Sequence, residues 1–196
     1  MDVIKHRSGQ GNGWSNFKNP VFGYSLIELL AVLATVSILM ATALPDFNSL
    51  IANERTTTIT NALAGALAYA RSQAIIKNVN IITCQSINSR TCNKSEKWDQ
   101  GWIIFIDKNR NKQRETEETL LRVYAAFDNG TTVTFDGSGA GIKYYIKYKP
   151  SGEAHPNGSF FICNPDIGKG KALIMSHSGR LRLSNKRTNG SVVTCS

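Results

Sequence analysis

The sequence predicts an α+β fold in which a long N-terminal helix packs on an antiparallel β-sheet domain. Three observations predict it: one long apolar run near the N-terminus, a helical period that continues beyond that run, and a series of short strand-like runs after it. Charged residues make up 19% and hydrophobic residues 41% of the 196 residues, which excludes a disordered chain and a polytopic membrane protein.

The first element is a membrane span that follows a short polar leader. Residues 1–23 form the leader, with three basic residues and one acidic residue. Residues 24–44 read YSLIELLAVLATVSILMATAL, in which Glu28 is the sole charge. Such a helix is about 31 Å long, close to the thickness of one bilayer core. The basic flank predicts a cytoplasmic N-terminus, an inner-membrane anchor and an exported C-terminal part. No convincing small-residue cleavage site follows the apolar run, so the span is expected to be retained.

The second element is an amphipathic continuation of the same helix over residues 45–78. Apolar residues recur there at steps of three and four, which is the period of a helix with one buried face. We expect this part to lie against the exported domain. The residues of the apolar face are Phe47, Leu50, Ile51, Ile59, Ala62, Leu63, Ala66, Leu67, Ala70 and Ala74.

Residues 79–183 are predicted to form the antiparallel β domain. Short apolar runs alternate there with turn-forming clusters of Gly, Pro, Asn, Asp and Ser, which favours hairpins. The strand candidates are Val79–Cys84, Trp102–Asp107, Thr119–Tyr124, Thr131–Phe135, Lys143–Tyr148, Ser159–Cys163, Ala172–Ser176 and Arg180–Leu183. Residues 184–196 are left as a basic C-terminal tail.

The four cysteines are interpreted as two disulfides in an oxidising compartment. Cys84 and Cys92 enclose seven residues and could close one loop, whereas Cys163 and Cys195 could tie the tail to a strand. The sequential pairing is favoured, and the two other pairings stay open. A zinc site is the alternative, but the spacings do not suit it.

One hairpin carries a pattern close to a calcium-binding loop. Asp107, Asn109 and Asn111 alternate along the chain, and Glu118 follows eleven residues after Asp107. Lys112 stands where such a loop has its glycine, and nearby basic side chains oppose a cation. We therefore expect a plain turn here and no metal.

The sequence contains no catalytic constellation. It has no P-loop, no HExxH, no G-x-S-x-G and no convincing nucleophile–histidine–acid set. We expect a protein that is not an enzyme and that uses no cofactor.

Glu28 indicates the family. A carboxylate within a span is costly and usually has a partner, unless it reaches the interface. Its surroundings, Gly23-Tyr24-Ser25-Leu26-Ile27-Glu28-Leu29-Leu30, resemble the prepilin signature of type IV pilins and type II secretion pseudopilins. The resemblance implies a pilin-like fold, cleavage after Gly23 by prepilin peptidase, and methylation of the new amine of Tyr24. It also implies that Glu28 pairs with the terminal amine of a neighbouring pilin in a filament.

The remainder of the chain resembles the FimT/GspH group of minor pilins and pseudopilins. The segment Tyr69–Asn78 is similar to the end of that group's long helix, and Gly101-Trp102 with Phe105 and Asp107 follows the same pattern. The ending Ser178-Gly179-Arg180-Leu181-Arg182 belongs to it too. The Gly-Arg-x-Arg motif resembles that of FimT-type minor pilins, which implies DNA binding during natural transformation.

The basic charge is concentrated near the C-terminus. The last 30 residues hold six basic residues and no Asp or Glu, out of a net charge of +9 for the chain. If Gly179 turns the chain into a strand, Arg180 and Arg182 face solvent about 7 Å apart, while Leu181 and Leu183 face the core. That separation matches the phosphate spacing of a nucleic-acid strand. The predicted DNA-binding residues are Arg180, Arg182, Lys186, Arg187, Lys169 and Lys171. A merely solvated tail is the alternative.

The sequence thus predicts a minor type IV pilin that binds extracellular DNA non-specifically and supports DNA uptake. Two alternatives lack a DNA ligand: a type II secretion pseudopilin, and a minor pilin that only primes pilus assembly. The expected location is the inner membrane with a periplasmic domain before assembly, then the pilus at the cell surface.

Overall fold

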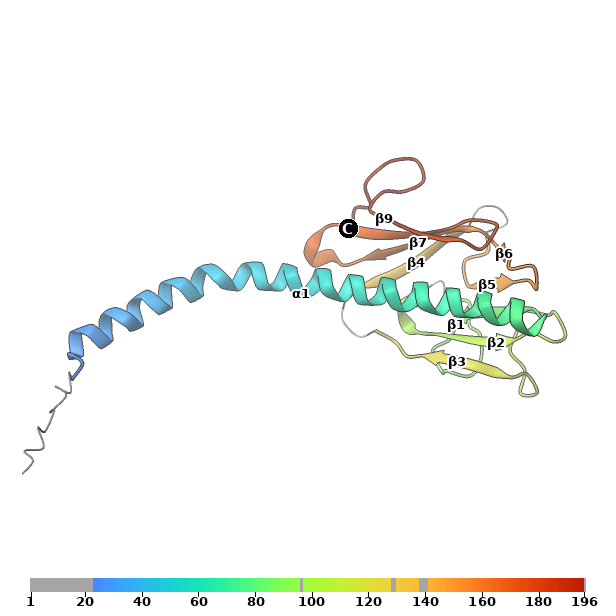
Figure 1. The fold of residues 1–196 in the computed structure, drawn as a ribbon, viewed down its shortest axis with the longest axis horizontal. Coiled ribbons are helices and arrows are strands. Elements are labelled where there is room, and N and C mark those ends of the chain that lie inside the picture. Colours follow the sequence, from blue (N-terminus) through green and yellow to red (C-terminus); the bar gives the residue numbers. More distant parts are fainter. Residues whose placement is uncertain (1–22, 96, 128–129, 138–140, 196) are drawn as a thin grey trace, which may run out of the picture. The chain divides into compact units, whose positions relative to one another are not determined.

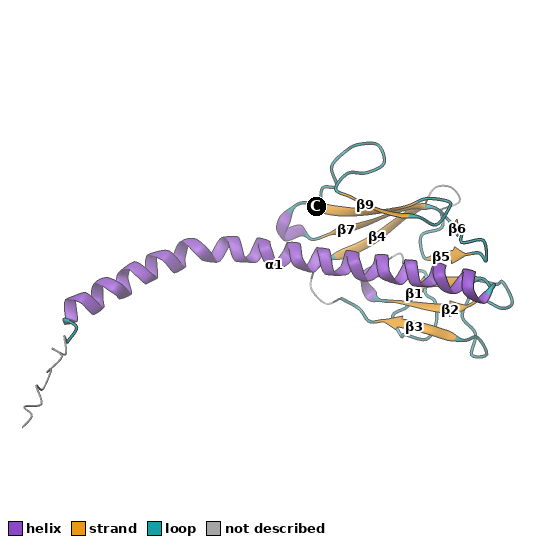
Figure 2. Cartoon of the chain, in the orientation of Figure 1, coloured by secondary structure: helices purple, strands orange, loops and turns teal. Residues whose placement is uncertain are grey.

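The computed structural model describes residues 23–95, 97–127, 130–137 and 141–195, and for residues 42–47 it describes the backbone alone. Apart from Gly23, the predicted leader lies outside this range. The chain divides into two units, Met1–Ala43 and Leu44–Ser196. The described residues form one helix, two sheets and two short 3-10 turns (Figures 1 and 2).

The helix α1 spans Leu26–Lys77 and so belongs to both units. In the first unit the Ser25 carbonyl accepts from the amides of Glu28 and Leu29, which begins the helix. Glu28 Oε2 accepts from Ser25 N at 3.4 Å, as the Glu of a capping box does. The apolar side chains that follow are largely exposed, as Leu26 at 76% and Leu30 at 56% show. Within the described residues, no helix combines the length and apolarity needed to cross a membrane. Part of the predicted 24–44 span, residues 42–44, lacks described side chains.

In the second unit, α1 buries one face against the sheets. Its fully buried residues recur at steps of three, four and seven, as the amphipathic pattern predicts. They are Ala52, Thr56, Ile59, Thr60, Leu63, Ala66, Leu67, Ala70 and Ala74, whereas Leu50 and Ile51 of the predicted apolar face are 54% and 44% exposed. Asn78 ends the helix with φ +54°, and the Val79 amide donates to the Ala74 carbonyl at 3.3 Å.

Two antiparallel sheets complete this unit. The first has the order β3-β2-β1-β5-β6, from β1 (Ile81–Gln85), β2 (Trp102–Ile106), β3 (Leu120–Tyr124), β5 (Tyr145–Tyr148) and β6 (Ala154–His155). The second has the order β4-β7-β8-β9, from β4 (Thr132–Gly137), β7 (Gly158–Cys163), β8 (Gly170–Met175) and β9 (Leu181–Ser184). All eight predicted strands are present, and β6 is the strand that the sequence did not indicate.

One core joins the helix to both sheets. Trp98 follows β1 in the short turn η1 (Trp98–Gln100), and its ring contacts Phe160 of β7 edge-on at 5.0 Å between centroids. Its Nε1 donates to the Lys143 carbonyl at 2.9 Å, so this large buried side chain is also satisfied. A second cluster lies on β1, β2 and β5, around Ile82, Phe105 and Tyr145.

The disulfides match the sequential pairing. Cys84 of β1 bonds to Cys92 in the loop that follows, and Cys163 at the end of β7 bonds to Cys195. The segment 107–118 joins the neighbouring strands β2 and β3 as the expected hairpin. Burial, reinforced by the nearby charge of Glu118 and opposed by backbone hydrogen bonds, raises the pKa of Asp107.

Candidate nucleic-acid interface

The turn between β8 and β9 presents the Gly-Arg-x-Arg motif. Gly179 N donates to the Ser176 carbonyl at 2.9 Å, and Ser176 N donates to the Arg180 carbonyl at 3.0 Å. The hydroxyl of Ser176 accepts from Arg180 N at 3.3 Å and lies 2.9 Å from that of Ser178. The backbone leading into Arg180 is therefore fixed by local hydrogen bonds.

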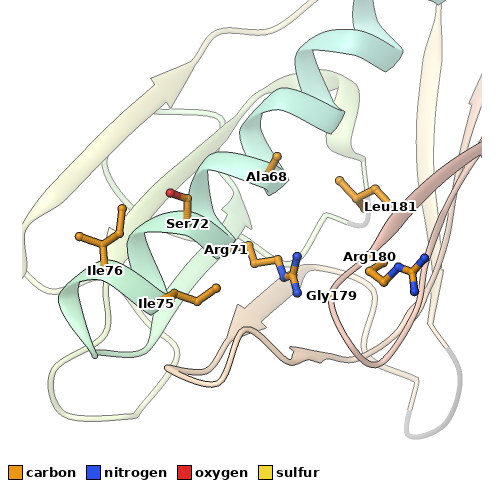
Figure 3. Close-up of a pocket in the computed structure, with 8 residues that line it drawn as sticks. All are labelled: Ala68, Arg71, Ser72, Ile75, Ile76, Gly179, Arg180 and Leu181. Atoms are coloured by element: carbon orange, nitrogen blue, oxygen red, sulfur yellow. The ribbon is translucent and has the colours of Figure 1, made fainter.

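Arg71 of α1 attaches this turn to the helix. Its Nε donates to the Gly152 carbonyl at 3.1 Å, and its Nη2 donates to the Ser178 carbonyl at 3.0 Å. The guanidinium thus joins two turns that are far apart in sequence, and Figure 3 shows it extending from α1 toward Gly179. Arg71 was not among the residues predicted from the sequence; an arginine that ends an otherwise small and apolar helix segment was the available signal.

Gly179 is required where it stands. Its φ is +75°, and a Cβ atom there would lie 2.3 Å from the Gly152 carbonyl oxygen and 2.9 Å from Arg71 Nε. The left-handed backbone and the close approach of a second chain segment both exclude a side chain. The motif's glycine therefore serves to seat the turn against Arg71 and Gly152.

Arg180 and Arg182 are exposed, as predicted. Arg182 lies in β9 opposite Ile174, and Leu181 beside it packs against the main core. Arg180 borders two open grooves, one of about 480 Å³ with Arg71 and Ile75, and one of about 460 Å³ with Ser176 and Arg182. Arg180 and Arg182 thus line one groove together with Ser176 and Ser178, whose hydroxyl groups can also donate to phosphate oxygens.

Leu183 lies on the predicted side of β9, but it is not buried in the core, so this part of the prediction is wrong. Leu183 lies opposite Leu173 and so has the inward side of the alternation, but its side chain is 52% exposed. The reason is its position on β9, which is the edge strand of its sheet. It instead borders a groove together with Asn53, Thr56 and Lys171.

The predicted tail is an ordered part of the domain. Lys186 pairs with Val192 and Lys169 with Thr194 in isolated β-bridges. Val193 is fully buried, and its amide donates to the Asn185 carbonyl at 3.2 Å. These contacts and the disulfide to Cys163 hold the segment in place, because they attach it to the rest of the domain at several points.

The six predicted DNA-binding residues fall into two groups. Lys169, Arg180, Arg182 and Lys186 are exposed. Lys171 is half-buried and donates to Thr57 Oγ1 of α1 at 2.6 Å, and Arg187 is half-buried with its guanidinium 4.3 Å from the centroid of the Phe161 ring. These two side chains already have partners, so they are less available to phosphate than the first four.

Glu153 is an acidic residue that interacts electrostatically with His177 in this turn, and it forms an ion pair with Lys149. Its Oε2 accepts from Lys149 Nζ at 2.8 Å, and this hydrogen bond is the main cause that lowers its pKa, with a smaller effect from His177. The neighbouring turn therefore adds little net negative charge beside Arg180.

The predicted processing residues lie at the start of the described chain. Tyr24 is 89% exposed, and nothing approaches within 4 Å of the position that a Cβ atom on Gly23 would take. Glu28 makes the capping contact described above. Their roles in cleavage and assembly stay predictions.

Comparisons with known proteins show which family this chain matches. Residues 60–179 match the model of the family described as "Type II transport protein GspH". No curated protein gives a significant match. The match ends at Gly179, so the cations from Arg180 onward lie outside it.

Solved structures of pilins are similar to this chain. The type IV minor pilin FimU of Pseudomonas aeruginosa is 20% identical with a TM-score of 0.50, over 67% of this chain and 90% of that one. A second crystal form of FimU gives 21% identity and a TM-score of 0.47, over 65% and 91%. The minor pseudopilin EpsH from the type 2 secretion system of Vibrio cholerae gives 13% and 0.46, over 66% and 96%.

The family match covers more than half of the sequence, and the described helix and antiparallel sheets agree with it. The chain belongs to the GspH family of minor pilins and pseudopilins.

Proposed function

We propose that this protein is a minor type IV pilin that binds extracellular DNA without sequence preference and supports DNA uptake in natural transformation. The observation that carries the proposal is the anchored turn. Arg71 and Gly179 fix the backbone of residues 176–180, so that Arg180 at the end of the turn and Arg182 in the edge strand β9 are presented from a fixed backbone. A fixed pair of guanidiniums loses less freedom on binding phosphate than a mobile basic tail does.

The chemistry of the surface suits a nucleic-acid backbone. Arginine binds phosphate with two parallel N–H groups, and serine hydroxyls beside it add donors. No described helix presents basic residues in a form suited to the major groove, so the proposed contacts go to phosphates and carry no sequence information. Lys169 and Lys186 extend the exposed charge along the same C-terminal segment.

Assembly with other pilins completes the proposal. After cleavage by prepilin peptidase, the amine of Tyr24 would pair with Glu28 of a neighbouring subunit, which offsets the desolvation of both groups. The apolar, exposed side chains of the first helical unit would anchor the protein in the inner membrane and then line a filament core. The domain of residues 44–196 would be periplasmic first and then displayed on the pilus.

Binding of a fluorescent duplex of mixed sequence tests the DNA ligand. We expect the full chain in detergent to bind with a dissociation constant on the order of micromolar at low salt. The R180Q/R182Q variant should bind at least roughly tenfold more weakly, because two phosphate contacts are lost. The matched control is R90Q/K97Q, which removes two exposed cations from the loop after β1 and should bind like the parent.

The family itself favours a second function. A pseudopilin of a type II secretion system, or a minor pilin that primes assembly, needs Gly23, Glu28 and the helix but no DNA ligand. Equal binding by the parent, R180Q/R182Q and R90Q/K97Q would favour that function over ours.

A further inference from the structure

The hairpin between β2 and β3 has the backbone of a cation-binding loop. Calcium loops of twelve residues take ligands from positions one, three, five, seven, nine and twelve, and turn sharply at position six. Counted from Asp107, position six is Lys112, whose φ is +64°. The objection raised by the missing glycine is therefore removed, since Lys112 adopts the left-handed conformation that the turn requires.

Hydrogen bonds from amides of the loop hold its side-chain oxygens in place. Lys112 N donates to Asp107 Oδ1 at 3.4 Å, Asn111 N donates to Asn109 Oδ1 at 3.1 Å, and Gln113 N donates to Asn111 Oδ1 at 2.8 Å. Glu118 closes the loop, because its Oε1 accepts from Lys108 N at 2.8 Å and its Oε2 from Glu115 N at 3.2 Å. Each of these oxygens keeps a second lone pair.

A buried carboxylate oxygen inside this loop lacks a partner. Asp107 is 2% exposed, and its Oδ2 has no hydrogen-bond partner in the part of the chain that the structure describes. Glu118 is 4% exposed, so two carboxylates are held out of water at the two ends of one loop. Burying unpaired charge is costly, and coordination of a metal is one of the ways in which proteins offset that cost.

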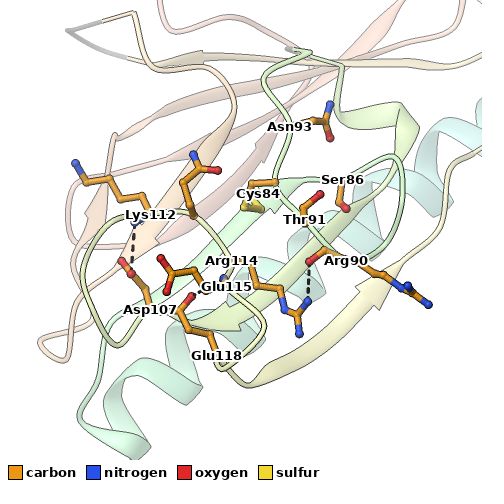
Figure 4. Close-up of a disulfide and its surroundings, with 12 residues drawn as sticks. Cys84, Ser86, Arg90, Thr91, Asn93, Asp107, Lys112, Arg114, Glu115 and Glu118 are labelled. Carbon is orange, nitrogen blue, oxygen red and sulfur yellow. Dashed lines mark hydrogen bonds between the residues drawn. A yellow bond between two sulfur atoms is a disulfide. The ribbon is translucent and has the colours of Figure 1, made fainter.

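The basic residues of the loop point elsewhere. Arg114 Nη1 donates to the Arg90 carbonyl at 2.9 Å, and Lys112 Nζ lies 5.9 Å from the centroid of the Tyr145 ring. Figure 4 shows both side chains directed away from Asp107 and Glu118. Arg110 is exposed. The basic side chains therefore weaken the negative potential of the loop, but they do not pair with the carboxylates of Asp107 and Glu118.

We propose that the loop of residues 107–118 binds Ca²⁺. The ligands are Asp107, the amide oxygens of Asn109 and Asn111, the Gln113 carbonyl and Glu118. Glu115, at the ninth position, accepts from Asn111 Nδ2 at 2.7 Å and leaves that place to water. No three His, Cys, Asp or Glu side chains among the described residues converge as a metal cluster, so amide and carbonyl oxygens supply much of the shell. With so few anionic ligands, the expected dissociation constant is on the order of 0.1–1 mM, as in extracellular modules.

Thermal unfolding of the full chain in detergent tests the proposal, with Ca²⁺ or Mg²⁺ against EDTA at equal ionic strength. At 10 mM Ca²⁺ the midpoint should rise by roughly 3–11 °C. Mg²⁺ should give a smaller rise, because it is smaller and demands octahedral geometry. E118Q should abolish the rise, whereas the matched control E117Q, which changes an exposed neighbour, should keep it.

Two further variants decide the case if E118Q does not fold. N109A removes one exposed ligand and should weaken Ca²⁺ binding in calorimetry. K112G removes a positive charge and suits the left-handed backbone, so it should tighten binding by roughly twofold to fourfold if the charge lies about 10 Å from the ion. The proposal is overturned if Ca²⁺ leaves the parent's midpoint unchanged, or if N109A and K112G both bind Ca²⁺ like E117Q.

Discussion

Replacing Arg71 by Met should destabilise the domain through the turn that carries Arg180. The substitution keeps most of the aliphatic length and removes the hydrogen bonds to the carbonyls of Gly152 and Ser178, at 3.1 and 3.0 Å. Gly152 is buried and Ser178 is exposed, so the first bond contributes the larger share. Hydrogen bonds to charged groups contribute about 1.5–3 kcal/mol each when buried and less when exposed, which gives a loss of roughly 2–4 kcal/mol.

Thermal unfolding measures this loss. For a chain of this size it corresponds to a fall in midpoint of roughly 4–16 °C. The unfolding midpoint of Arg71→Lys should lie between those of Arg71→Met and the parent, because an ammonium keeps the charge but not the planar geometry that donates in two directions. The control is Arg55→Met, an exposed position on the same helix, which should change the midpoint little. If Arg71→Met and Arg55→Met unfold at the same temperature, Arg71 does not hold the turn.

Three other predictions concern separate parts of the chain. Gly179→Ala should lower the free energy of unfolding by at least about 2 kcal/mol, because its Cβ would lie 2.3 Å from the Gly152 carbonyl oxygen. Gly190→Ala, at a φ of +86° with open space around it, should lower it by about 1 kcal/mol. Equal losses in thermal unfolding would show that the close approach to Gly152 is unimportant. Replacing Cys163 and Cys195 by Ser should lower the free energy of unfolding by about 3–4 kcal/mol, since the bridge spans 32 residues. It should also weaken DNA binding, because the segment that carries Lys186 is then less well held. An unchanged denaturant midpoint would contradict this. Mass spectrometry of the membrane-extracted protein should find an N-methylated chain beginning at Tyr24, and an intact Met1 end would refute the processing.

The periodic features of the fold were predictable from the sequence. The buried face of α1 from Ile59 to Ala74 follows helical spacing, and β7 and β8 follow short apolar runs, because each pattern reflects which side of an element meets the core. The strand β6 escaped notice, since two residues are too short to show a period.

The features that depend on long-range contacts were not predictable. Arg71 contacts Ser178, 107 residues away, and no local pattern indicates that pairing. Leu183 has the expected alternation but stays exposed, because the sequence does not say that β9 is an edge strand. Lys112 shows the same limit for the backbone, since a lysine in the left-handed conformation contradicts local preference and needs the surrounding loop to hold it.

The salt dependence of DNA binding tests the central claim most directly. If Arg180, Arg182, Lys186 and one further cation each neutralise a phosphate, a plot of log K against log salt should have a slope of about −3 to −4, from roughly 0.9 per contact on duplex DNA. The R180Q/R182Q variant should flatten the slope by about two, and R90Q/K97Q should leave it unchanged. A double variant whose slope and affinity equal those of the parent at every salt concentration would contradict a DNA interface at the anchored turn.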